Sequence, residues 1–168
     1  MKRTILAIFA LVLICSTTKA QDEKFKALFM YNFTKYIEWP QVKQSGDFVI
    51  GVIGSSAIVT ELNAIAQRKT VGSQTIKVKE VNVADELSKL HIVYVAESQT
   101  DKAVSIAEKI KGKGVLLITD KPGMAKSNSG INYIKKDGKQ LFEVSSKHLT
   151  EEGVKASNQL MVLGVQID

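Results

Sequence analysis

Three short polar groups follow apolar stretches of the sequence and are the first candidates for chemistry. Gly54-Ser55-Ser56 comes after one apolar run, Ala96-Glu97-Ser98 after a second and Asp120 after a third. In an open α/β sheet, ligands bind beyond the carboxyl ends of the strands. We therefore predict a crevice for a small ligand at Ser55, Glu97 and Asp120.

The glycines at the first of these groups do not form a nucleotide-binding motif. Gly51 and Gly54 have no third glycine at the spacing of the dinucleotide fingerprint, and no P-loop lysine follows. The start of the next helix could still hold an anion, but an ordinary turn between strand and helix is the simpler interpretation. We expect no cofactor here.

The remaining reactive side chains do not assemble into a catalytic or metal-binding set. His91 begins an expected strand and His148 an expected helix, and neither has another metal ligand at helical spacing. The only cysteine is Cys15, and no serine lies in a nucleophile elbow. We predict that the protein is not an enzyme, that both histidines serve packing or capping, and that no metal is bound.

The first twenty residues have the pattern of a secretory signal peptide. Lys2 and Arg3 precede an apolar run from 5 to 14, and small or polar residues lead to Ala20. The run is too short to span a membrane. We predict cleavage after Ala20, a periplasmic protein, and one domain over residues 21–168. A lipoprotein anchored through Cys15 is the weaker alternative, since Ile14 precedes that cysteine.

Removal of this leader changes the charge of the chain. Of 23 basic residues, three lie in the leader, so 20 remain against 17 acidic ones, a net charge of +3. The lysines are mostly spread along the chain, which does not favour nucleic-acid binding. The mature chain would also contain no cysteine, which excludes disulfides and cysteine-based catalysis.

The elements that position these residues alternate between strands and helices. Expected strands cover 48–53, 75–81, 91–95 and 115–119, with helices between them. Continuous apolar runs are typical of strands that are buried on both faces of a parallel sheet. Residues 131–134 and 140–144 flank Asp137-Gly138 and predict a hairpin. We expect a three-layer α/β/α fold whose mixed, mainly parallel sheet has an antiparallel hairpin at one edge.

Two helical regions complete the expected fold. The segment from Phe29 to Pro40 contains five aromatic residues, and with Phe25 its periodicity predicts a helix that ends at Trp39 and Pro40. Most of its aromatic face should be buried, with exposed Tyr and Trp edges left to meet a partner. The tail from 145 to 168 predicts two helical pieces broken near Gly153, the second with an apolar stripe.

Several of these segments together resemble the YfiR family of small periplasmic regulators. They are Tyr31-Asn32-Phe33-Thr34-Lys35-Tyr36-Ile37-Glu38-Trp39-Pro40, Ile53-Gly54, the stretch from Leu90 to Ser98, the stretch from Leu117 to Asp120, the stretch from Gly130 to Tyr133, Phe142-Glu143-Val144 and the stretch from Ala156 to Leu160. Family members often carry a cysteine where this chain has Leu90, and usually a glycine where it has Ser129. The resemblance therefore does not carry redox control over to this chain.

The resemblance implies a regulator that binds the periplasmic part of an inner-membrane signalling protein. The expected partner is a diguanylate cyclase, which would link the chain to cyclic di-GMP and biofilm control; a sensor kinase and a homodimer remain open. We place the partner contacts at Tyr31, Tyr36, Glu38 and Trp39. The competing hypothesis is a periplasmic receptor for a small ligand in the crevice near Ser55.

Overall fold

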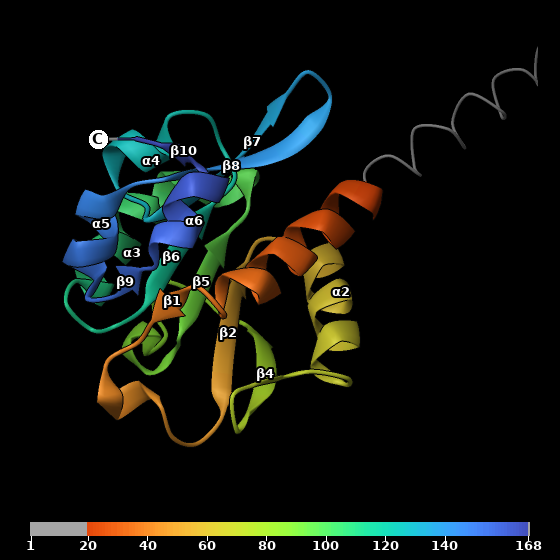
Figure 1. The fold of residues 1–168 in the computed structure, drawn as a ribbon. Coiled ribbons are helices and arrows are strands. Elements are labelled where there is room, and N and C mark those ends of the chain that lie inside the picture. The colour runs from red at the N-terminus through yellow and green to blue at the C-terminus, as the bar shows by residue number, and fades with distance from the viewer. Residues whose placement is uncertain (1–19, 168) are drawn as a thin grey trace, which may run out of the picture.

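The protein is built around one twisted, mainly parallel sheet, seen in a computed structural model that describes residues 20–167. The strand order is β10-β8-β7-β6-β5-β2-β4-β3. The five strands from β4 to β7 run parallel to one another, whereas β8 is antiparallel to β7 and β3 is antiparallel to β4 (Figure 1). The predicted α/β class and mixed sheet are confirmed.

The strands of the large sheet are β2 (Phe48–Ile53), β3 (Thr70–Val71), β4 (Gln74–Glu80), β5 (Ile92–Val95), β6 (Leu116–Thr119), β7 (Ile131–Lys136), β8 (Lys139–Val144) and β10 (Val165–Gln166). A separate two-stranded sheet pairs β1 (Ile37–Glu38) with β9 (Lys155–Ala156). The helices are an N-terminal helix over residues 20–33, α2 (Ser56–Ala66), α3 (Ala103–Ile110), α4 (Met124–Ser127), α5 (Ser146–Glu152) and α6 (Asn158–Leu163), with 3-10 turns at Gln41–Lys43, Leu87–Lys89 and Glu97–Lys102.

Two apolar cores lie on the two faces of the sheet. The larger core joins the sheet to the N-terminal helix, α2 and α6 through Phe33, Ile58 and Leu160. The smaller core joins it to α3 through Ile106 and Ile110. Because β5 and β6 are covered from both sides, all of their residues are buried, as the continuous apolar runs predicted.

The N-terminal helix ends earlier than its aromatic periodicity predicted. It stops at residue 33, a turn follows, and Ile37 and Glu38 form β1. Backbone bonds three residues apart tighten the end, and the hydroxyl of Thr34 donates to the Tyr31 carbonyl at 2.6 Å. Pairing with β9 then draws the chain into an extended conformation. Our prediction of a helix up to Trp39 and Pro40 is wrong.

The C-terminal tail has the two predicted helices, α5 and α6, but more strand than expected. Gly153 ends α5 in the left-handed conformation, with φ of 83°, and β9 separates the two helices. The expected apolar stripe is buried only at Leu160, while Leu163 and Val165 are exposed. The last strand, β10, pairs with β8, so the hairpin lies one strand inside the edge of the sheet.

Candidate functional site

The crevice predicted at the carboxyl end of the parallel strands exists as a hollow of about 580 Å³. Ser55, Glu97 and Asp120 all line it, at the ends of β2, β5 and β6. Gly54 makes the turn between β2 and α2 with φ of +87°, and a Cβ there would lie 2.4 Å from the side chain of Gln99. The sequence therefore located this hollow, although its role stays a prediction.

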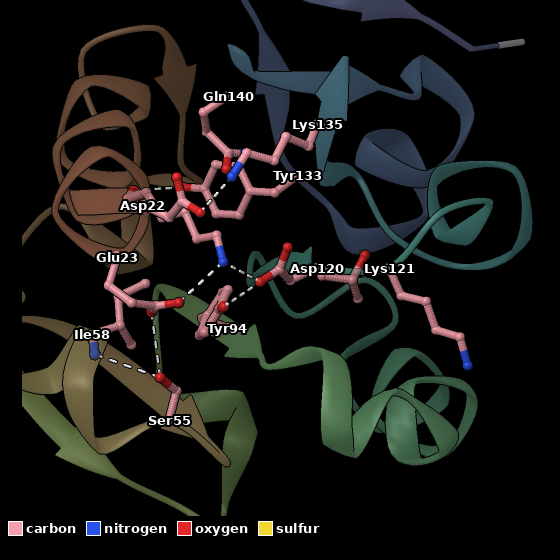
Figure 2. A network of polar contacts seen from close by, with 12 residues as sticks. Asp22, Glu23, Ser55, Ile58, Tyr94, Asp120, Lys121, Tyr133, Lys135 and Gln140 are labelled. Carbon is pink, nitrogen blue, oxygen red and sulfur yellow. Dashed lines mark hydrogen bonds and ion pairs between the residues drawn. The ribbon is translucent and has the colours of Figure 1, made fainter. Parts of the chain in front are cut away.

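The N-terminal helix closes one side of this hollow with the ammonium group of Lys26. Its Nζ lies 2.5 Å from Asp120 Oδ2 and 3.0 Å from Glu23 Oε1. The hydroxyl of Tyr94 donates to the same Asp120 oxygen at 3.0 Å, and Ser55 donates to Glu23 over 3.4 Å. Figure 2 shows Glu23, Tyr94 and Asp120 converging from three elements. We call these five side chains the Lys26 network.

The electrostatics of the network favour a fixed ion pair. Burial on its own would lower the pKa of Lys26, but hydrogen bonds and charges from Asp120 and then Glu23 outweigh it, so that pKa is raised. Burial, with the nearby carboxylates, raises the pKa of the Tyr94 hydroxyl. The ammonium is thus charged and the phenol neutral at ordinary pH, which suits positioning and gives neither group a role as a base.

Tyr133 fixes the same helix from the hairpin side. Its fully buried hydroxyl donates to the Lys26 carbonyl at 2.7 Å, and burial, followed by the Asp120 charge, raises its pKa well above the usual value. Side chain and main chain of Lys26 are therefore both held, by residues about a hundred positions away along the chain.

Sequence reasoning missed Lys26, although a signal was present. Lys26, Met30 and Phe33 follow one another at spacings of four and three, so the lysine lies on the buried stripe of the helix. A lysine on such a stripe needs a buried acid as partner. The apolar pattern instead suggested Phe25 as an inward residue, which is wrong, since Phe25 is 44% exposed.

The aromatic segment has two buried rings, Phe33 and Trp39, and several accessible residues. Trp39 is only 8% exposed, and its indole donates to the His91 carbonyl at 3.2 Å. The expected exposed tryptophan edge is therefore wrong. Tyr31 is half-buried with the ammonium of Lys35 4.9 Å from its ring centre, and Glu38 is exposed on β1. Partner contact through Tyr31, Tyr36 and Glu38 stays a prediction.

Tyr36 lies at an apolar depression between the N-terminal helix, β8 and α6. This depression, which we call the aromatic groove, has a volume of about 280 Å³. It is lined by Phe29, Asn32, Phe33, Tyr36, Leu141, Phe142, Leu160 and Leu163. The three phenylalanines of this lining pack closely, with ring centres 4.8 to 6.3 Å apart.

His91 has the predicted packing role. It is buried against Phe48, with ring centres 4.3 Å apart. Its Nδ1 accepts from the Val49 amide at 3.1 Å, so the proton lies on Nε2, which donates to the Lys43 carbonyl at 2.8 Å. Burial lowers the pKa of His91. His148 lies in the first turn of α5, where Ser145 caps the helix and contacts its ring at 2.9 Å.

The described residues contain neither a metal-binding cluster nor a membrane-spanning helix. Within residues 20–167, no group of three or more His, Cys, Asp or Glu side chains is arranged to hold a metal ion. No helix in that part of the chain is both long and apolar enough to cross a membrane. Residues 1–19 of the predicted leader, including Cys15, lie outside the described residues, and its last residue, Ala20, begins the N-terminal helix.

Comparison with known proteins gives a family assignment. No curated protein matches the chain significantly. A family model described as YfiR/HmsC-like, by contrast, matches residues 23–165. The matched range includes all five residues of the Lys26 network and the aromatic segment from Phe29 to Pro40. The resemblance inferred from the sequence is confirmed, and the chain belongs to the YfiR/HmsC-like family.

Proposed function

We propose that the protein is a periplasmic, non-enzymatic regulator that binds an inner-membrane signalling protein and controls its output. The family match supports a regulatory role. The most favoured partner is a diguanylate cyclase, contacted through its periplasmic part, so that the output is cyclic di-GMP and biofilm formation.

The observation that carries this proposal is that the N-terminal helix lies at the carboxyl edge of the parallel strands and pairs there with Asp120. Where an open α/β enzyme binds its substrate, this chain places its own helix and the Lys26 ammonium. Lys26 and Asp120, two charged side chains that line the hollow, already pair with each other. An intramolecular ion pair there favours a protein that acts through its surface.

We place the partner contact at the aromatic groove and the adjoining outer side of β1. Tyr36 lines the groove, Leu163 beside it is exposed, and Glu38 lies on β1 next to Tyr36. Protein interfaces concentrate their binding energy in aromatic anchors that enter apolar pockets. Trp39, being buried, would support this surface from below. Tyr31 does not line the groove, and its contact with the partner is a separate prediction.

The proposal is tested by deletion and by pull-down from solubilised membranes. Deleting the gene should change cyclic di-GMP in cells, and the mature protein should retain a membrane signalling protein. Tyr36→Ser and Leu163→Ser should weaken retention, whereas Val104→Ser, which alters an exposed residue of α3 on the opposite face of the sheet, should not. Only variants that melt like the wild type are compared.

Three results would contradict the proposal. The first is a deletion that leaves cyclic di-GMP and membrane-kinase outputs unchanged. The second is equal retention by all three variants, which would move the contact surface elsewhere. The third concerns location, because the periplasmic fraction released by osmotic shock should contain a protein whose intact mass begins at Gln21. A mass that includes the leader, or a lipid on Cys15, would refute the periplasmic assignment.

The hollow beside the Lys26 network supports a second candidate, a receptor for a small polar ligand. Glu97 is exposed at its rim, and Ser55 caps α2 within it. A ligand that binds there would raise the melting temperature by linkage. Glu97→Gln should remove that shift and leave pull-down of the membrane partner unchanged, which separates the two candidate functions.

A further inference from the structure

We propose that the protein also docks on anionic phospholipid through a surface formed by the N-terminal helix and the tip of the β7–β8 hairpin. We call it the helix–hairpin surface and define it by Lys24, Phe25, Leu28, Lys136 and Lys139. This inference uses the proposed export of the chain but does not depend on the identity of its protein partner.

The two parts of this surface are held together by contacts in the fold. Figure 1 shows the hairpin projecting from the body of the molecule beside the start of the N-terminal helix. Lys135 in the hairpin binds Asp22 in the helix at 2.7 Å. Between them lies a hollow of about 440 Å³, whose lining includes Phe25 and Lys139. A flat membrane surface could therefore reach helix and tip together.

The hairpin tip carries positive charge in an arrangement that opposes folding. Lys136 and Lys139 are directly opposite each other in the antiparallel ladder, and both are exposed. Like charges at paired positions destabilise a hairpin. Neither lysine forms an ion pair with any residue in the described part of the chain, and Asp137 between them is the only acid of the turn. An anionic surface would relieve this repulsion.

The helix contributes apolar side chains next to this charge. Phe25 is 44% exposed and Leu28 is 47% exposed, although both belong to a helix whose other side is well buried. Lys24 is exposed beside them, while the two acids of the same turn, Asp22 and Glu23, already have lysine partners. Exposed apolar residues flanked by unpaired lysines are typical of segments that lie on anionic membranes.

A lipid surface fits these features better than an acidic protein does. The lysines are spread over a helix and a separate tip, so they match a broad layer of charge, and no concave pocket is needed. Each lysine near an anionic membrane strengthens binding about fivefold at ordinary ionic strength. Such binding is weak on its own but would orient the protein beside a membrane partner.

The test is co-sedimentation of the purified mature protein with phosphatidylcholine vesicles prepared with and without phosphatidylglycerol. We expect binding only to the vesicles that contain phosphatidylglycerol. It should weaken strongly between about 0.1 M and about 1 M salt, where the screening length falls from about 10 Å to about 3 Å. Replacing both tip lysines, Lys136→Gln with Lys139→Gln, should reduce binding about 25-fold.

Two further variants separate this surface from general charge. Lys77→Gln with Lys79→Gln removes two exposed lysines from β4, near the other edge of the sheet, and should leave binding close to wild type. Phe25→Ser should weaken binding about fivefold through lost apolar burial. The tip variant should melt no lower than the wild type, because it removes a repulsion.

The proposal is overturned by equal binding to both vesicle types, by no binding to either, or by an equal loss in the tip variant and the β4 control. Binding of the protein to a soluble acidic protein but not to the charged vesicles would assign the surface to a protein partner instead. None of these results bears on the membrane-protein pull-down, since the vesicles contain lipid only.

Discussion

The Lys26–Asp120 contact should be the largest single polar contribution to stability in the described part of the molecule. In Lys26→Met the apolar stem is kept, but Asp120 and Glu23 lose their shared cation. Removing one partner of a buried ion pair costs about 3–5 kcal/mol. Because the two side chains keep 11% and 19% of their area exposed, we take the lower end, about 3 kcal/mol.

That free energy corresponds to a measurable change in melting temperature. For a domain of this size, 1 kcal/mol shifts the midpoint by about 2–4 °C, so Lys26→Met should melt about 6–12 °C below the wild type. Thermal unfolding followed by circular dichroism measures it. Lys35→Met is the matched control, since Lys35 is exposed in the turn that follows this helix and its replacement should lower the midpoint little.

A double-mutant cycle with Asp120→Asn isolates the pair itself. If the ion pair is the cause, the double variant should be less destabilised than the sum of the two single variants, with a coupling energy above about 1 kcal/mol. Lys26→Met with a wild-type midpoint, or a cycle with additive effects, would refute our description of the network as a fixed ion pair.

Three further predictions concern buried groups elsewhere. Trp39→Ala and Phe33→Ala should each cost about 3–5 kcal/mol, because both side chains are buried, and wild-type melting of either variant would contradict that burial. Glu152 is 3% exposed, and burial raises its pKa well above 4.5. The wild type should therefore lose stability as pH rises above 4.5 toward the folded-state pKa. Glu152→Gln should abolish this loss, which urea unfolding across pH measures. The pH dependence of stability that His91 causes has the opposite sign, because burial lowers the pKa of His91 below 6.5. Its contribution to stability is complete above pH 6.5 and is lost as pH falls below that value. His91→Gln should show no such loss.

Much of the fold could be predicted because strands that are buried on both faces have a local apolar sequence pattern. The runs at 48–53, 92–95 and 116–119 are apolar at nearly every position, and each became a strand covered on both faces. Asp137-Gly138 marked the hairpin turn, where both residues have positive φ. The positions of Ser55, Glu97 and Asp120 followed from these strands and from the shared polarity of a parallel sheet.

The elements that were missed depend on contacts distant in sequence. Strands β1, β9 and β10 have two residues each and form because a partner strand lies beside them. Segments this short have no sequence periodicity that could predict them. The N-terminal helix ends earlier than predicted for the same reason, because Ile37 pairs with Ala156 of β9. Lys26 was overlooked because its acid is 94 residues away, and only the assembled sheet brings the two together.

The attachment of the N-terminal helix has a consequence for how this chain completes its fold. The carbonyls of Lys26 and Tyr36 are held by Tyr133 and by the amide of Ser157, and Ile37 pairs with Ala156. A chain that emerges from a ribosome or a translocase with its N-terminus first would expose the aromatic helix long before these partners appear. This early segment is thus among the last to dock, and its unpaired aromatic stripe is the surface that a chaperone would need to cover until Tyr133, Ala156 and Ser157 have emerged.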